Sequence, residues 1–126
     1  MAIAKEFKRT LLESIKTDTF KVALYTSSST IDENTTVYTT TNEIVATGYT
    51  AGGAVLSGAS VDVDGTGYAL NFNSHVFTGG NIVARKAAIY DVTKGNKVVS
   101  VIDFGEDRGV IGSGGEFTVD AFVRLP

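Results

Sequence analysis

The side chains best suited to catalysis in this sequence are a single histidine and its serine neighbour. His75 is the one histidine among 126 residues, so it would have to be the base of any Ser-His-Asp triad. Ser74 directly precedes it, and adjacent residues of a strand point to opposite faces, so the two side chains cannot meet in regular β structure. Because no serine lies in the G-x-S-x-G pattern either, we expect His75 to be an ordinary polar or half-buried side chain.

Carboxylates supply the next candidate chemistry. Asp62, Asp64 and Gly65 resemble the start of a calcium-binding loop. The further ligands and the closing bidentate glutamate do not follow at the right offsets. We therefore expect a hairpin turn with solvated carboxylates at this position.

A second acidic stretch lies near the C-terminal end of the chain. Residues 106–115, EDRGVIGSGG, lack the Lys-Ser/Thr pair of a P-loop, and no helix pattern follows them. We expect a polar loop here, with Asp103, Glu106 and Asp107 as solvated carboxylates rather than a catalytic pair. The sequence thus predicts no catalytic residue, no cofactor site and no metal site, and a protein that is not an enzyme.

The composition excludes several classes of partner and site. A formal net charge of -3 and a pI near 5.0 lack the basic footprint of direct nucleic-acid binding. The absence of cysteine excludes disulfides and thiolate metal sites. No apolar run approaches the ~20 residues of a membrane span, and the charged N-terminus does not read as a signal peptide, so we expect synthesis in the cytoplasm without membrane contact.

The elements that would position these residues begin with a helix over residues 1–17. Large apolar side chains recur there every four residues, with charged residues on the remaining surface. A lone helix of this length is marginal in water, so the stripe must dock on the body of the protein or on a partner. This stripe is the first set of candidate interface residues and consists of Ile3, Phe7, Leu11 and Ile15.

Strand patterns fill most of the remaining chain. Residues 20–25 alternate with one face expected to be buried, 59–72 read as a hairpin, and 75–78 as a short strand. A long hairpin follows over 81–105, with a turn at Gly95 and Asn96, and residues 116–126 form a closing strand. About eight strands after one helix predict a single all-β domain over 1–126, a jelly-roll-like antiparallel β-sandwich with one N-terminal α-helix.

One threonine-rich stretch does not fit this pattern. Residues 26–53 are β-prone but hold few large aliphatic side chains, too few to fix about 28 residues against the entropy cost of ordering them. We predict an extended arm that lies over a neighbouring subunit and turns back at Gly52 and Gly53, with Val37, Tyr38 and Tyr49 as candidate contacts. An ordinary pair of short strands within the domain is the alternative.

Two charged residues interrupt the otherwise apolar strand at 81–92. Arg85 and Lys86 point to opposite faces, so at least one is expected on a covered face, where it needs a carboxylate partner. An ion pair across a subunit interface and a strand that tilts out to solvent both explain them.

Two blocks of the sequence resemble a known family. Residues 11–58, with DTFKVALYTS, a threonine-rich run and GYTAGG, and residues 84–105, with VIDFG, are similar to small virion-associated structural proteins of tailed bacteriophages. The resemblance implies a head decoration or cement protein that binds the major capsid protein or another virion protein and assembles as a homotrimer or homodimer. A neck or tail component and a carbohydrate-binding β-sandwich module remain as alternatives.

Overall fold

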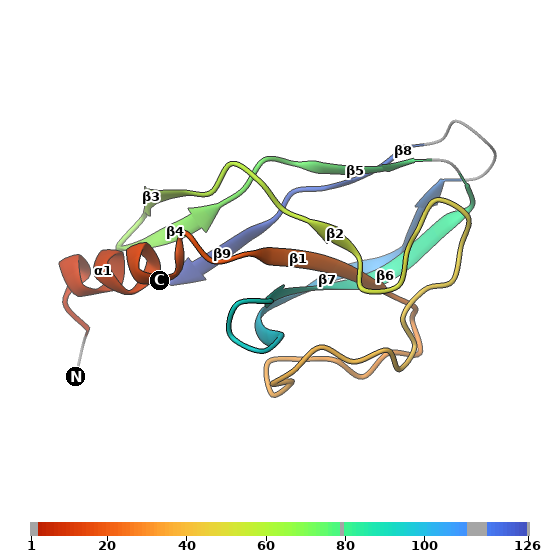
Figure 1. Cartoon of the computed structure of the whole chain (residues 1–126), viewed down its shortest axis with the longest axis horizontal. Helices are drawn as coiled ribbons and strands as arrows, with labels where there is room; N and C mark the ends of the chain where they lie inside the picture. The colour runs from red at the N-terminus through yellow and green to blue at the C-terminus, as the bar shows by residue number, and fades with distance from the viewer. Residues whose placement is uncertain (1–2, 79, 111–115, 126) are drawn as a thin grey trace.

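A computed structural model describes residues 3–78, 80–110 and 116–125 (Figure 1). Strands make up 47% of the chain and the one helix is short, so the prediction of a mostly β, antiparallel fold with an N-terminal helix is confirmed. The elements are α1 (Lys5–Ile15), β1 (Phe20–Tyr25), β2 (Ala54–Val55), β3 (Ser60–Asp64), β4 (Gly67–Asn71), β5 (His75–Thr78), β6 (Ile82–Asp91), β7 (Lys97–Val110), β8 (Glu116–Val119) and β9 (Phe122–Leu125).

The strands form three antiparallel sheets within the described residues. The largest has the order β2-β1-β6-β7, the second β3-β4-β9, and the third pairs β5 with β8. The β3–β4 and β6–β7 hairpins occupy the positions predicted from the alternation. The turn before β7 contains Gly95 and Asn96 at φ values of 74° and 63°, as expected for residues that tolerate this backbone region.

One apolar cluster joins the three sheets and the helix. Phe20 and Ile89 enter it from the largest sheet, Leu70 from the second and Phe77 from the third. The C-terminal segment takes part in two of the three sheets. We predicted one closing strand, but the chain leaves β8, which pairs with β5, and continues as β9, which pairs with β4. Its alternating apolar side chains all reach the same cluster: Phe117, Val119, Ala121, Val123 and Leu125.

Strand β1 is buried on both faces, which corrects the expectation of one buried face. Phe20, Val22 and Leu24 face the main cluster, as the alternation predicted. Ala23 and Tyr25 are also fully buried, in a second cluster on the opposite face of the sheet. The sequence pattern predicted that Ala23 and Tyr25 face solvent, because the residues that cover them, such as Ile31, belong to a later segment of the chain.

Strand β7 is longer than predicted. The stretch from residue 106 to 110 was expected to be part of a loop, but it continues β7 and pairs with the beginning of β6. A Cβ atom at Gly109 would lie 2.7 Å from the backbone oxygen of Ile82, so the missing side chain permits the close approach. The remainder of the predicted loop, 111–115, lies outside the described residues.

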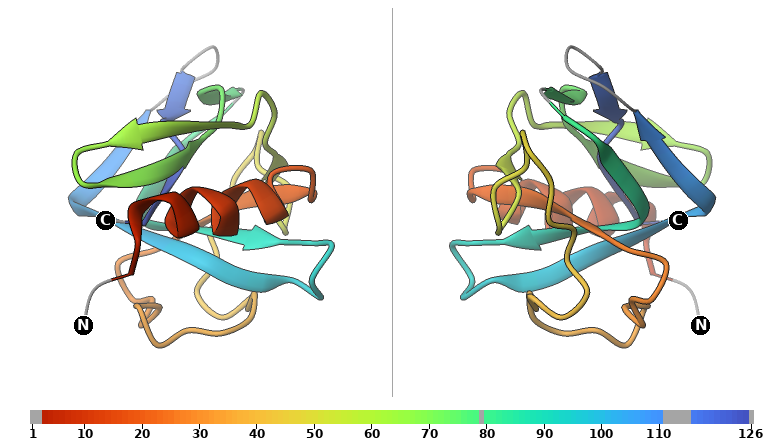
Figure 2. Two further views of the ribbon diagram at one scale, coloured as in Figure 1. Left: turned by 90° about the vertical axis from the view of Figure 1, so that its left-hand side faces the viewer. Right: turned by 90° about the vertical axis from the view of Figure 1, so that its right-hand side faces the viewer.

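Helix α1 lies at one end of the molecule against the β3–β4 hairpin (Figures 1 and 2). Leu12 is 4% exposed and Ile15 packs beside it on the main cluster, so these two side chains form the docked face. The ammonium of Lys5 lies 5.8 Å from the centre of the Tyr68 ring, which adds a cation–π contact with β4.

Candidate functional site

The residues with predicted chemistry do not assemble into a catalytic group. His75 is half-buried, and its ring meets Phe77 edge-on at a centroid distance of 4.5 Å. Burial lowers the pKa of His75 below its usual value. Ser74 donates a short hydrogen bond to the carboxylate of Asp120 instead of facing the histidine. Ser74 and His75, which are adjacent in the sequence, therefore have different partners in the structure.

The acidic motif at 62–65 forms the hairpin turn that the sequence predicted. The carboxylate of Asp62 accepts hydrogen bonds from Ser60 at 2.8 Å and from Asn71 at 3.0 Å, which lower its pKa. Asp64 forms an ion pair with Arg124 on β9 at 2.5 Å. Among the described residues, no group of three or more histidine, aspartate or glutamate side chains is placed to hold a metal ion.

Arg85 and Lys86 both find partners within the chain. A register shift between β6 and β7 lies at Arg85, whose Nε atom donates to Oδ1 of Asp103 at 2.9 Å. This bond lowers the pKa of Asp103. Lys86 lies opposite Asp103 in the ladder, and its Nζ atom donates to the backbone oxygens of Ile31 at 2.9 Å and Ser29 at 3.3 Å. The expected carboxylate partner is thus present for Arg85, while backbone carbonyls take its place for Lys86.

Residues 26–53 lie on the chain's own sheet, at the lower right of Figure 1. Ile31 and Tyr38 pack against β1, β6 and β7 in the second apolar cluster. Backbone hydrogen bonds hold the middle of the segment, because the N–H of Ile44 donates to the oxygen of Leu24 at 3.1 Å and the N–H of Tyr38 donates to the oxygen of Asn96 at 2.9 Å. Contact of the same segment with a neighbouring subunit stays a prediction.

A carboxylate surrounded by tyrosines holds this segment in place. Glu43 accepts hydrogen bonds from the hydroxyls of Tyr38 and Tyr49, each at 2.5 Å, and from the backbone N–H of Gly52 at 2.7 Å. Burial and the Glu43 charge raise the pKa of Tyr25 to about 12, and burial and these hydrogen bonds raise the pKa values of Tyr38 and Tyr49 as well. The cluster is a structural latch that sequence reasoning missed.

The candidate interface residues differ in exposure. Tyr49 is 9% exposed and donates inward to Glu43, so in this conformation it offers little surface to a partner. Tyr38 is half-buried and stacks on Tyr90, with ring centroids 4.7 Å apart. Val37, by contrast, is 51% exposed on the outer side of the segment.

The first part of the predicted stripe is the clearest free apolar surface among the predicted residues. The helix, predicted over 1–17, begins at Lys5 and ends at Ile15, so Ile3 precedes it. Ile3, Phe7 and Leu11 are 47%, 54% and 39% exposed. The helix is already docked through Leu12 and Ile15, so this surface is not needed to hold it on the body of the protein.

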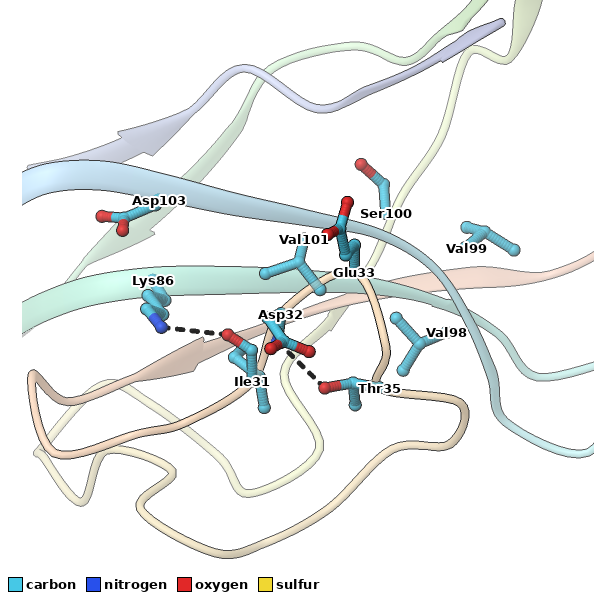
Figure 3. Close-up of a pocket in the computed structure, with 10 residues that line it drawn as sticks. All are labelled: Ile31, Asp32, Glu33, Thr35, Lys86, Val98, Val99, Ser100, Val101 and Asp103. Carbon is cyan, nitrogen blue, oxygen red and sulfur yellow. Dashed lines mark hydrogen bonds between the residues drawn. The ribbon is translucent and has the colours of Figure 1, made fainter.

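A groove of about 440 Å³ runs between residues 31–35 and strand β7 (Figure 3). Residues 31–33 and 35 form one wall, residues 98–101 and 103 form the other, and Lys86 lies between them. Asp32 shapes the first wall, since its carboxylate accepts from the N–H of Asn34 at 2.8 Å and its own N–H donates to Thr35. We call this feature the β7 groove.

A second, more open pocket of about 400 Å³ lies on the outer face of the β3-β4-β9 sheet. Phe122, which is 39% exposed, lines it together with Asn71 and the Asp64–Arg124 ion pair.

No family model, curated protein or solved structure matches this chain. The described part of the chain contains no helix that is long and apolar enough to cross a membrane.

Proposed function

We propose that this protein is a non-enzymatic structural component of a tailed-bacteriophage virion that decorates or cements the capsid lattice through protein–protein contacts. The observation that carries the binding function is an exposed apolar stripe, formed by Phe7 and Leu11 of a helix already docked by other residues and by Ile3 just before it. The virion assignment rests on the resemblance of residues 11–58 and 84–105 to that class of proteins.

The partner in this proposal is the major capsid protein or another virion protein. The chain itself assembles as a homotrimer or homodimer on the particle, after synthesis in the host cytoplasm. Its acidic charge argues against direct contact with the genome. A position in the neck or tail is the alternative within the same class.

We also propose that the three sheets pack as a jelly-roll-like β-sandwich over residues 1–126. The support is the shared apolar cluster, in which β1 and β6 of one sheet meet β4 of the second and β5 of the third.

A pair of helix variants tests the binding function. Phe7→Gln removes the centre of the stripe without a change of charge, and Thr10→Gln places the same side chain at an exposed position of the same helix. Both variants should fold, because neither residue is buried. Binding is measured by cosedimentation with particles of the encoding phage that lack this protein, and images of intact particles locate the chain.

The expected result is loss of particle binding in Phe7→Gln and retention in Thr10→Gln. Equal binding by both variants would contradict a contact through the stripe, and absence of the chain from intact particles would contradict the virion assignment.

Carbohydrate binding is a second candidate because of the outer pocket at Phe122. An exposed aromatic ring beside amide, carboxylate and guanidinium groups combines an apolar platform with hydrogen-bonding groups. Phe122→Ala should then abolish binding to an immobilised glycan panel while Phe7→Gln leaves it intact. A wild-type protein that binds no glycan on the panel removes this candidate.

A further inference from the structure

Strand β7 has an unpaired outer edge. It is the last strand of the β2-β1-β6-β7 sheet, so β6 pairs with one side of it only. On the other side, residues 36–38 contact its beginning, through a bridge between Val37 and Lys97 and a hydrogen bond from the N–H of Val98 to the oxygen of Thr36. Beyond Val98, the described residues show no further backbone partner on this side.

The sequence of this edge carries few of the features that prevent strand addition. Exposed edges are usually protected by charged residues, by proline or by very short strands. Residues 98–104, VVSVIDF, contain one charged residue and no proline, and the strand is 14 residues long. The register shift between Val98 and Ser100 is a protective feature in this stretch. The charges of Glu106, Asp107 and Arg108 come only after this stretch.

The β7 groove runs along the same stretch of edge (Figure 3). Six residues from Val98 to Asp103 span about 20 Å at the usual rise of a strand. Residues 31–35 form the far wall, and a strand paired with β7 would lie about 4.8 Å from it, on the side of the groove. An inserted strand would continue the ladder that residues 36–38 begin at Lys97.

The charge of the lining indicates the chemistry of the occupant. Asp32 and Glu33 contribute two carboxylates that form none of the ion pairs found in the described residues, while Asp103 is paired with Arg85. The ammonium of Lys86 is engaged with backbone oxygens. Val98 and Val101 contribute apolar surface between the carboxylates. Side chains of an added strand alternate between two faces, so a segment that alternates apolar and basic residues matches this lining.

Within the binding function proposed above, we propose that the β7 groove takes up an extended, alternately apolar and basic segment of a neighbouring protein as an additional strand on the edge of β7. The backbone groups of β7 supply the affinity, and the valines and carboxylates of the groove select the sequence. The helical stripe is then a separate contact on the same particle.

The probe is a synthetic peptide of alternating lysine and valine, with a glutamate–valine peptide of the same length as its counterpart. Amide exchange and ¹H–¹⁵N spectra of the full chain are recorded with each peptide. The lysine peptide should protect amides between Val99 and Asp103, and the glutamate peptide should not. Equal effects of the two peptides, or protection only outside β7, overturn the proposal.

A matched pair of charge reversals locates the contact. Glu33→Lys changes an exposed residue of the groove wall, and Glu106→Lys makes the same change on β7 itself, beyond the groove. The first should weaken lysine-peptide binding about fivefold or more, and the second less than about twofold. Equal weakening in both means that binding is unspecific charge attraction and contradicts the proposal.

Two further outcomes separate this inference from the proposed function. If Glu33→Lys binds particles like the wild-type protein while Phe7→Gln does not, the groove is not the contact but the binding function stands. If the wild-type chain alone protects residues 99–103 with rising concentration and sediments as a dimer, the occupant is a second copy, and the proposed basic segment of another protein is wrong.

Discussion

Glu43 fixes a polar segment that holds few large aliphatic side chains. Its two carboxylate oxygens accept hydrogen bonds from Tyr38, Tyr49 and the N–H of Gly52, and the hydroxyl of Tyr49 in turn accepts from the N–H of Leu24 at 3.0 Å. Hydrogen bonds to a charged group are stronger than neutral ones. A glutamate in a threonine-rich run is typical of a solvated loop, so the sequence offered only the number of nearby tyrosines as a signal.

Replacing this carboxylate should loosen the segment. Glu43→Gln presents an N–H donor to at least one hydroxyl or amide that now donates to an oxygen, so we expect the free energy of unfolding to fall by about 1–3 kcal/mol. Denaturant unfolding measures the change. Glu33→Gln is the control, because Glu33 is an exposed residue of the same segment. Equal stability of the two variants would show that the latch does not contribute.

The neighbouring carboxylates of Asp91 and Asp18 make the stability of the fold depend on pH. Asp91 is 1% exposed, and burial together with the neighbouring Asp18 raises its pKa to about 6. The hydrogen bond with Asp91 and the ion pair with Lys94 at 2.8 Å lower the pKa of Asp18. Asp91 binds a proton more tightly when folded, so its contribution to stability is present below about pH 4 and is lost as the pH rises to about 6. Asp18 acts in the opposite direction, because its contribution is lost as the pH falls below about 4.

An uncharged residue at position 91 should remove the loss at higher pH. Asp91→Asn keeps an oxygen for the N–H of Lys94 and a donor for Asp18, without the buried charge. We expect the variant to be more stable than the wild-type protein at about pH 7.5, by about 1–3 kcal/mol, with little difference at about pH 4. Urea unfolding at the two pH values measures this. A variant that is less stable at the higher pH would show that the charged form of Asp91 is favoured in the fold.

At the scale of the elements, the sequence pattern predicted those helices, strands and turns whose formation depends on residues close together in the chain. The β3–β4 and β6–β7 hairpins and the helix follow from period and turn residues in short windows of sequence. The second buried face of β1 and the extension of β7 could not be predicted this way, because each depends on a partner far along the chain. Residues 26–53 cover β1, and the beginning of β6 extends the pairing of β7 to Val110.

A substitution at Gly53, where the chain turns back toward β2, tests the contact between residues 26–53 and β1. A Cβ atom at Gly53 would lie 1.8 Å from the backbone oxygen of Val22, and the residue has a φ of 83°. Gly53→Ala should therefore cost about 3 kcal/mol or more. Gly65 has a φ of 61°, and a Cβ atom there would meet no other atom within 4 Å, so Gly65→Ala should cost about 1 kcal/mol. Equal unfolding midpoints would contradict the close contact with β1.

At the scale of the whole molecule, the largest sheet is covered on both faces. One face meets the main apolar cluster, and the other meets the second cluster, in which Ile31 and Tyr38 come from residues 26–53. The candidate interface was predictable in part, since the helical period identifies Phe7 and Leu11 as apolar surface. The period could not show that Leu12, one position away, supplies the docked face, because that depends on the position of β4.

Hydrogen exchange on the isolated chain tests whether residues 26–53 need a neighbour to become ordered. The N–H groups of Tyr38 and Ile44 donate to backbone oxygens of the same chain, so both should exchange slowly, close to the amide of Ala88 at the centre of the sheet. Val45 is 99% exposed and has no backbone hydrogen bond among those described, so its amide should exchange quickly and serve as the internal reference. Tyr38 and Ile44 amides that exchange as fast as Val45, while Ala88 stays protected, would mean that the segment is undocked in the isolated chain. Strong protection that appears only on assembled particles would then favour the arm that lies over a neighbouring subunit.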